Sequence, residues 1–156
     1  MSTTAVMESP STAAPTPSPE ELAARLADAP FVRVVVAPTG GALAASGVIA
    51  RALRERTVPF QVRVRRASAY AVDDDALTLR IGSAGPADLT LGDPARTPAV
   101  AFEVARALET AADPYLALAG IAAGEADPAA STLADRAGLE RSPGVGLPVT
   151  DLADGL

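Results

Sequence analysis

The clearest pattern in the chain is a change from a continuous apolar run to a helical period between residues 31 and 55. Residues 31–37 (FVRVVVA) are rich in β-branched side chains, which is typical of a central strand covered on both faces. After the turn 38–41, apolar residues recur every three to four positions, and Arg51 and Arg54 fall on the opposite side. This segment therefore predicts a strand, a tight turn and an amphipathic helix.

Three further segments alternate between apolar and polar residues, as half-buried strands do. They are residues 60–65 (FQVRVR), 77–81 (LTLRI) and the shorter 88–91 (DLTL). Strand, helix and strands in this order, followed by helices, predict an α/β domain with a mostly parallel sheet, flanking helices and a helical C-terminal part.

The second half of the chain is helical in character. Residues 97–109 place apolar side chains on one face and charged ones opposite. Residues 114–123 (PYLALAGIAA) are apolar on all sides, which predicts a buried helix. A third helix is expected to begin at Asp127-Pro128 and to continue to about Ala137.

The N-terminal residues divide into a tail and the start of the folded domain. Residues 1–17 are rich in Ser, Thr, Pro and Ala, and we expect them to be disordered. Ser18, Pro19 and Glu21 fit a helix start, with Ser18 and Glu21 forming a capping box and Pro19 at the first helical position. The predicted organisation is a tail over 1–17 and one domain over 18–156.

Composition removes many enzyme classes. All 13 basic residues are arginine, and the chain has no His and no Cys, which excludes imidazole bases, His-containing triads and thiolate chemistry. The formal net charge of −6 argues against broad nucleic-acid binding, so single-stranded nucleic acid is a weak partner. No apolar run is long enough to span a membrane, and the N-terminus lacks the pattern of a signal peptide, so we expect a cytoplasmic protein without a membrane partner.

The turn after the first strand is a candidate anion site. Exposed N–H groups at a helix N-terminus suit an anion, with contacts from Gly40, Gly41 and the Thr39 hydroxyl. The same residues also suit a plain strand-to-helix turn that uses glycine for its backbone freedom. The turn is not a Walker loop, because the lysine and its spacing are missing.

Two charged clusters each allow a functional and a purely structural interpretation. Arginines gather between residues 51 and 66, which indicates either a basic patch for an acidic partner or a solvated face that keeps a strand soluble. The members of this predicted patch are Arg51, Arg54, Arg56, Arg63, Arg65 and Arg66. The acidic triplet Asp73-Asp74-Asp75 is interpreted as a solvated loop rather than a cation site, because neighbouring side chains in an extended loop diverge.

Longer stretches of the chain resemble a known family. Residues 40–64 (GGALAASGVIARALRERTVPFQVRV) resemble the first motif of the DHH phosphoesterases, in particular the archaeal RecJ-like proteins. In that motif an Asp-x-Asp-Gly turn follows the first strand and opens a helix of small residues. Residues 97–125 resemble the helical portion of the same family, and so does the C-terminal segment 141–156.

The resemblance carries over the fold but not the metal site. In active members the two aspartates of the turn bind the divalent ions, Mn²⁺ or Mg²⁺, that activate water. Their positions here are Thr39 and Gly41, and Ile81-Gly82-Ser83 resembles a second metal-site motif without its aspartate. The His-bearing motif cannot be present in a chain without histidine. We therefore expect no catalytic residue, no bound metal and no other cofactor.

These expectations combine into one functional hypothesis. The chain is similar to a catalytically degenerate RecJ-like protein limited to the front part of the DHH domain, without the family's substrate-binding domain. Family members that lost the metal site act as scaffolds in replication complexes, so replication or repair proteins are the implied partners, and self-association is possible. The alternative is a single-strand-specific exonuclease or phosphoesterase that uses other ligands or a second polypeptide.

Overall fold

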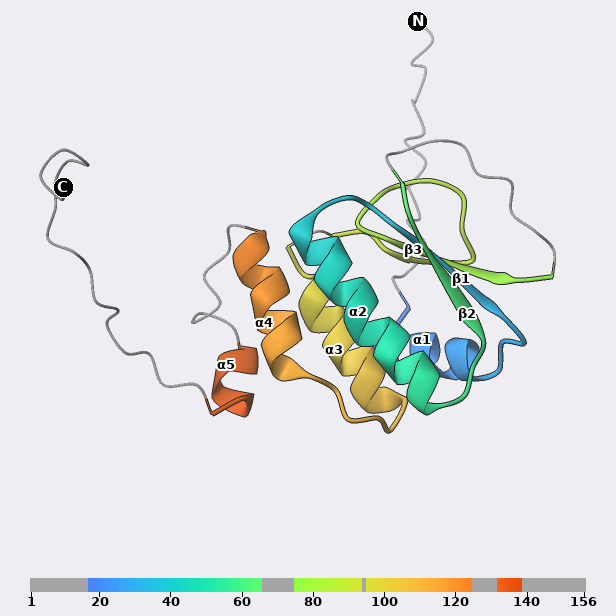
Figure 1. Ribbon diagram of the computed structural model, residues 1–156. Helices are drawn as coiled ribbons and strands as arrows, with labels where there is room; N and C mark the ends of the chain where they lie inside the picture. Colours follow the sequence, from blue (N-terminus) through green and yellow to red (C-terminus); the bar gives the residue numbers. More distant parts are fainter. Residues whose placement is uncertain (1–16, 66–74, 94, 125–131, 139–156) are drawn as a thin grey trace, which may run out of the picture.

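The computed structural model describes residues 17–65, 75–93, 95–124 and 132–138, which form a parallel sheet and a helix layer (Figure 1). The elements in chain order are α1 (Pro19–Ala27), β1 (Val32–Val36), α2 (Gly40–Glu55), β2 (Phe60–Val64), β3 (Leu77–Ile81), β4 (Leu89–Leu91), α3 (Thr97–Ala107), α4 (Pro114–Ala123) and α5 (Thr132–Arg136). Residues 1–16 of the predicted tail 1–17, Asp73, Asp74, the start of the third C-terminal helix and the C-terminal segment 139–156 lie outside the described residues.

The sheet has four strands in the order β2-β1-β3-β4, and every neighbouring pair is parallel. The α/β class, the parallel sheet and the helical C-terminal part were all predicted, and the structure confirms them. β1 lies between β2 and β3, and its apolar run is buried along its whole length. β2 lies at the edge of the sheet and is largely exposed. The continuous apolar pattern of β1 thus matches its central position, and the alternating pattern of β2 matches its position at the edge.

The start of α1 follows the predicted capping box. Glu21 N–H donates to Ser18 Oγ at 3.2 Å, and Ser18 N–H donates to Glu21 Oε2 at 2.8 Å. Pro19 stands in the first turn, where its missing N–H leaves no helical hydrogen bond unmade. The exchange satisfies two backbone donors that a helix start otherwise leaves without partners.

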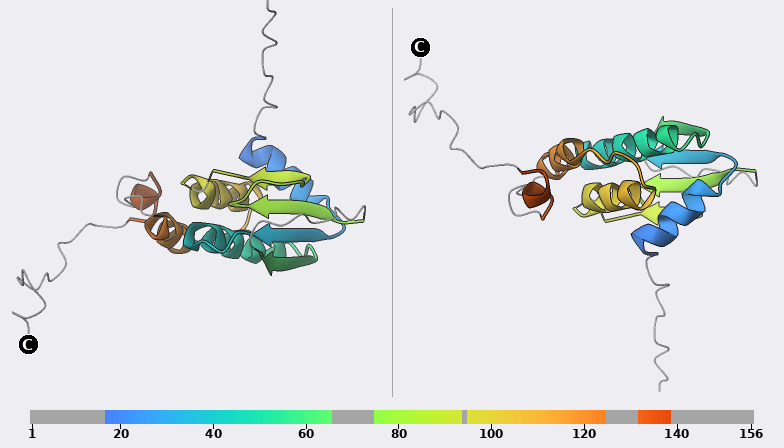
Figure 2. Two further views of the ribbon diagram at one scale, coloured as in Figure 1. Left: turned by 90° about the horizontal axis from the view of Figure 1, so that it is seen from above. Right: turned by 90° about the horizontal axis from the view of Figure 1, so that it is seen from below.

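The helices pack against one face of the sheet. Val32, Val34 and Val36 of β1 belong to a single core cluster with side chains from α1, α2, α3 and α4. Figure 1 shows α2 and α3 to the lower left of the strands and α1 beneath them, and Figure 2 shows the same arrangement turned by 90° in both directions. Of the described helices, none is long and apolar enough to cross a membrane.

The helix layer is held at close range by small residues between α2 and α4. A Cβ placed on Gly40 would lie 2.5 Å from the Ala123 Cβ, and one on Gly120 would lie 2.7 Å from the Ala44 Cβ. Side chains at these two positions would force the helices apart, because heavy atoms do not approach so closely. The seam between α2 and α4 therefore depends on glycine.

The prediction of a buried helix over residues 114–123 holds for one side of the helix only. Ala117, Leu118 and Ile121 of α4 are buried, but Ala119 is exposed and Tyr115 is 60% exposed. The described part of the chain packs α2, α3 and α5 around this helix and leaves one side open. An all-apolar helix indicates burial only where enough other elements surround it.

Candidate functional site

The predicted anion-binding turn lies at the carboxyl end of β1, where α/β proteins bind ligands. Thr39 is the N-cap residue of α2, with extended backbone angles of φ −122° and ψ 149°, and its side chain makes no capping hydrogen bond. Thr39 and Gly40 are exposed, and Gly41 is buried. The structure places these three residues together at the predicted edge.

Packing supplies a reason for glycine in this turn that does not involve a ligand. Gly40 sits against Ala123 of α4 at a distance that excludes any side chain. The plain strand-to-helix turn, the alternative weighed from the sequence, therefore has direct support at Gly40. Anion binding through Thr39, Gly40 and Gly41 stays a prediction.

The end of β3 is the second segment that the family resemblance singled out. Gly82 has a φ of +75°, which favours glycine, and a Cβ there would lie 2.7 Å from the Ala42 Cβ of α2. Its N–H donates to the Leu91 carbonyl at 2.8 Å. The Ile81-Gly82 step thus joins β3 to β4 and lets α2 approach the sheet, and Ser83 follows it.

The end of β4 contributes a carboxylate to the same edge. Asp93 Oδ1 accepts from the Ala95 N–H at 3.1 Å, and its carbonyl accepts from the Thr97 N–H at 2.8 Å. These bonds commit Asp93 to the turn that leads into α3. Within the part of the chain that the structure describes, no group of three or more acidic, His or Cys residues could hold a metal ion. Asp75, the described member of the acidic triplet, is exposed.

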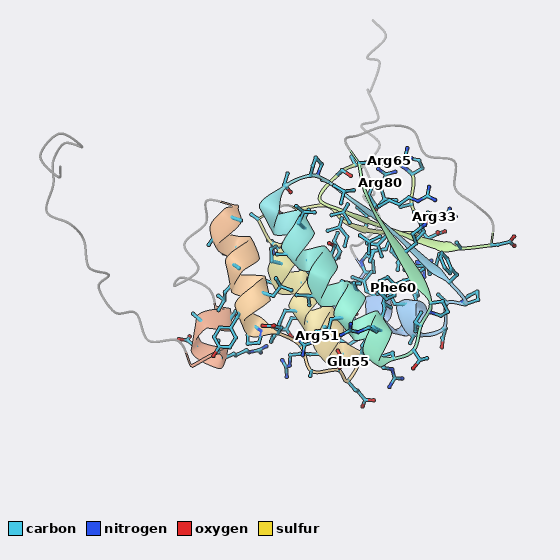
Figure 3. All side chains as sticks on the ribbon, viewed as in Figure 1. Arg33, Arg51, Glu55, Phe60, Arg65 and Arg80 are labelled. Atoms are coloured by element: carbon cyan, nitrogen blue, oxygen red, sulfur yellow. The ribbon has the colours of Figure 1, made fainter. Side chains whose placement is uncertain are left out.

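The structure separates the predicted basic patch into two parts. Arg51 and Arg54 lie on α2, whereas Arg63 lies on β2 and Arg65 directly follows it. Figure 3 shows Arg51 and Arg65 at opposite ends of the described molecule. Arg56 stands beside Arg51 and Arg54 as the C-cap of α2, and Arg66 lies outside the described residues. The grouping of α2 and β2 arginines into one patch is therefore wrong, because β2 runs back from the end of α2.

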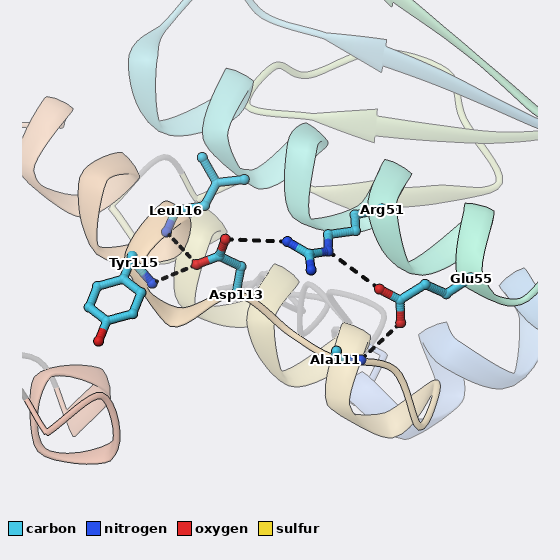
Figure 4. A network of polar contacts seen from close by, with 6 residues as sticks. All are labelled: Arg51, Glu55, Ala111, Asp113, Tyr115 and Leu116. Carbon is cyan, nitrogen blue, oxygen red and sulfur yellow. Dashed lines mark hydrogen bonds and ion pairs between the residues drawn. The ribbon is translucent and has the colours of Figure 1, made fainter.

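Arg51 belongs to a network that fastens α2 to the start of α4 (Figure 4). Its Nε lies 3.3 Å from Glu55 Oε1, and its Nη1 lies 3.5 Å from Asp113 Oδ2. Asp113 also caps α4 by accepting from the Tyr115 and Leu116 N–H groups, and Glu55 Oε2 accepts from the Ala111 N–H at 3.0 Å. The network gives Arg51 a structural role.

Two arginines that the sequence reasoning did not select lie on the sheet instead. Arg33 of β1 is 8% exposed and Arg80 of β3 is 2% exposed. Strand register aligns Val35 with both Arg63 and Arg80, so these two arginines share the face opposite the helices. The alternation of apolar and polar residues in β3 could have indicated that Arg80 faces away from the helices. Arg33 was harder to recognise because it stands within a run of apolar, mostly β-branched residues.

Arg80 is the most deeply buried of the described arginines. One Nη donates to the Pro86 carbonyl at 3.3 Å, and the buried Nε has no hydrogen-bond partner among the described residues. Gly85, with a φ of +141°, lies so close to the guanidinium that a Cβ there would be 2.9 Å from its carbon. The loop between β3 and β4 therefore folds over a buried cation, which is costly unless further contacts compensate it.

A surface hollow of about 770 Å³ lies beside the open edge of β4. It is lined by the start of α1, the backbone of β4 and the first turn of α3, including Leu22, Thr90 and Arg96. The carboxylates near it are engaged, since Asp88 Oδ2 accepts from the Thr78 N–H at 2.7 Å and Asp93 holds the turn described above. The hollow combines apolar walls with few convergent polar groups.

Comparison with known proteins gives one informative relative. The chain is 50% identical over 148 residues to an uncharacterized protein of the haloarchaeon Haloarcula marismortui. The alignment covers 91% of this chain but 39% of the relative, so the chain spans about two fifths of the length of the curated protein it matches. No protein-family model matches the chain. No solved structure matches it.

Proposed function

We propose that this chain is a catalytically inactive RecJ-like protein of the DHH family that acts as a binding component in DNA replication or repair. The parallel sheet, with a strand, tight turn and long helix at its start, is consistent with the resemblance of residues 40–64. The 50% identity to a haloarchaeal protein extends over 39% of that protein, so a chain that corresponds to part of a longer relative is compatible with the proposal.

One observation carries the inactive part of this proposal. The carboxyl ends of β1 and β3, where the resemblance places metal-binding aspartates, carry Thr39, Gly41 and Ser83. A two-metal phosphodiesterase needs several convergent carboxylates or imidazoles to hold its ions about 4 Å apart. Apart from Asp93, whose carboxylate accepts from the Ala95 N–H, the described residues at this edge supply backbone, hydroxyl groups and close glycine packing in place of that ligand set.

The binding part of the proposal follows from the resemblance. Relatives that lost their metal site serve as scaffolds, so the partners proposed here are replication or repair proteins in the cytoplasm. Single-stranded nucleic acid is the weaker candidate partner, because the net charge of the chain is −6.

Catalysis is tested with the full chain, Mn²⁺ or Mg²⁺, and labelled single-stranded DNA, RNA and small phosphodiesters. We expect no turnover above that of the metal alone, and no micromolar Mn²⁺ binding by calorimetry. A matched variant with Thr39→Asp and Gly41→Asp should also stay inactive, because the histidine motif is still missing. Micromolar metal binding together with metal-dependent turnover would establish the alternative, an exonuclease or phosphoesterase with other ligands.

Binding is tested by affinity enrichment of the tagged chain from the organism that encodes it. Nuclease treatment of the extract removes proteins that are held through DNA or RNA. An unrelated tagged protein of equal net charge controls for electrostatic capture. Enrichment of replication or repair proteins over this control supports the proposal, and an enriched set without any of them contradicts it.

A further inference from the structure

The outer edge of β2 is an open strand edge with apolar side chains exposed beside it. Among the residues that the structure describes, β2 is the terminal strand of the sheet and pairs with β1 alone (Figure 2). Val62 is 37% exposed and Val64 is 52% exposed. By register they lie on the helix-covered face beside Val34 and Val36, but α2 does not bury them. Such an edge is a template for a further strand.

The backbone groups that point outward from β2 can be identified from its bonds to β1. Val32 N–H donates to the Pro59 carbonyl at 2.9 Å, and Arg65 N–H donates to the Val36 carbonyl at 2.9 Å. In a parallel strand the N–H and C=O of one residue point to the same side, and successive residues alternate between sides. Gln61 and Arg63 therefore face β1, whereas Phe60, Val62 and Val64 present their N–H and C=O groups to the open edge.

We propose that the chain forms a two-fold dimer in which β2 pairs antiparallel with β2 of a second copy, centred on Val62. Val62 then lies opposite Val62 of the second copy, and Phe60 lies opposite Val64. These pairs contain the outward-pointing backbone groups, so each pair exchanges both of its N–H···O bonds. The pairing joins two four-stranded sheets into one continuous sheet.

The sequence of β2, FQVRV, is matched to itself in this register. All apolar residues meet apolar residues on the helix-covered face. On the other face Gln61 meets Arg63 of the second copy, and these side chains already form a 2.9 Å hydrogen bond within one copy, from Arg63 Nε to Gln61 Oε1.

The two neighbouring registers are less favourable, one because of like charges and the other because fewer residues pair. Arg65 lies opposite Pro59 of the second copy in the proposed pairing, so no arginine faces an arginine. Moving the second strand by two residues in one direction would place Arg63 directly opposite Arg63, and like charges directly opposite each other are destabilising. Moving it by two residues in the other direction would place Gln61 opposite Gln61 and would pair only residues 60–62 of the strand, whereas the proposed register pairs all of 60–64. This polarity match is the reason to assign the edge to a second copy of the chain.

The absence of cysteine makes cross-linking a direct test of the register. Hydrogen-bonded antiparallel pairs hold their Cα atoms about 5.5 Å apart, which lies within the range of about 4.4–6.8 Å that a disulfide requires. The full chain with Val62→Cys should therefore form a disulfide-linked dimer under mild oxidation at low protein concentration.

Val64→Cys is the matched control. Val64 is more exposed than Val62, but the two Val64 residues of the dimer would lie four residues apart along the strands, roughly 14 Å at 3.4 Å per residue. We expect little cross-linking of this variant. Cross-linking of Val64→Cys as fast as that of Val62→Cys, or none for Val62→Cys, would overturn the proposal.

Sedimentation equilibrium of charge variants gives an independent reading. Val62→Lys and Val62→Glu each place like charges on the two-fold axis, and each should weaken the dimer about tenfold or more. An equal mixture of the two variants should restore the dimer, because opposite charges then meet. Leu43→Lys on α2, at a position 43% exposed, should leave the dimer unchanged.

Circular dichroism establishes first that each variant retains its helices. A monomeric wild-type chain, dimers that tolerate both charges, a mixture that stays monomeric, or a dimer lost with Leu43→Lys would each contradict the proposed edge.

Discussion

The two faces of the sheet are built on different chemistry, although their residues alternate within the same strands. On one face Val34 of β1 and Leu79 of β3 are buried in the cluster that the helices complete. On the other face Arg33 and Arg80 are also buried, at 8% and 2% exposure. The side chains on the two faces are equally buried, but their burial changes the free energy of folding in opposite directions. Burial of apolar area is favourable, and burial of a charge is costly.

The apolar residues of the helix-covered face stabilise the fold, whereas the buried arginines of the other face are not needed for folding. The helix-covered face explains the stability of the domain through apolar area and close packing. Among the described residues, the face that carries Arg33 and Arg80 also buries Val35, but its buried charges cost free energy unless contacts offset them. We therefore expect substitutions on neighbouring residues of one strand to have effects of different size and sign.

The largest effect is expected for Leu79→Ala on the helix-covered face. Leu79 is 1% exposed in the centre of β3, where it neighbours Val34 of β1 in register and belongs to the core cluster that the helices complete. Truncation removes apolar burial and leaves a cavity, so the free energy of unfolding should fall by about 2–5 kcal/mol. Chemical denaturation monitored by circular dichroism measures the change. A loss below about 1 kcal/mol would show that this face does not dominate the stability.

The helix-covered face was predictable because its signals are local. The β-branched run of β1, the alternation in β3 and the capping box of Ser18 and Glu21 each depend on short-range stereochemistry. These patterns predicted the elements, their order and the parallel class of the sheet. The candidate turn 38–41 was placed at the correct edge for the same reason, since strand, turn and helix are contiguous.

The remaining features depend on contacts between distant segments. Gly40 appears as a turn residue until Ala123 is known to lie against it. Arg80 joins Arg63 on one face only through the register of β2, β1 and β3. The predicted patch of Arg51 with Arg65 was wrong because residues near in sequence lie on elements that point apart. Contacts between segments that are distant in the sequence produce no periodic pattern of residues, so they cannot be predicted from a single sequence in this way.

The second prediction sharpens the account of the helix layer at the seam between α2 and α4. Gly120→Ala should lower the free energy of unfolding by about 1–3 kcal/mol. Alanine favours a helix over glycine by about 1 kcal/mol, but its Cβ would lie 2.7 Å from the Ala44 Cβ and 3.0 Å from the Pro98 Cγ. Thermal and chemical denaturation measure the net change.

Gly47→Ala is the control for that variant, on the facing helix. The nearest atom to its new Cβ is the Leu116 Cδ2 at 3.1 Å, the end of a flexible side chain that can move. Helix propensity should therefore prevail, and stability should stay equal or rise by up to about 1 kcal/mol. Equal destabilisation by both substitutions would mean that the seam is uniformly tight rather than set by Gly120.

The smallest effect, and the most direct test of the two faces, is expected for Arg80→Met. Methionine retains much of the arginine side-chain volume and removes a buried cation whose Nε has no hydrogen-bond partner among the described residues. The variant gives up the bond to the Pro86 carbonyl, so we expect stability between unchanged and about 1 kcal/mol higher. Arg51→Met is the matched control, because Arg51 is largely exposed and paired with Glu55 and Asp113. That change should cost about 0.3–0.5 kcal/mol at low salt and less at high salt, where surface ion pairs are screened. Denaturation of both variants at two salt concentrations separates the cases. A loss above about 2 kcal/mol for Arg80→Met would mean that its guanidinium holds the β3–β4 loop in place and that the arginine face also supports the fold.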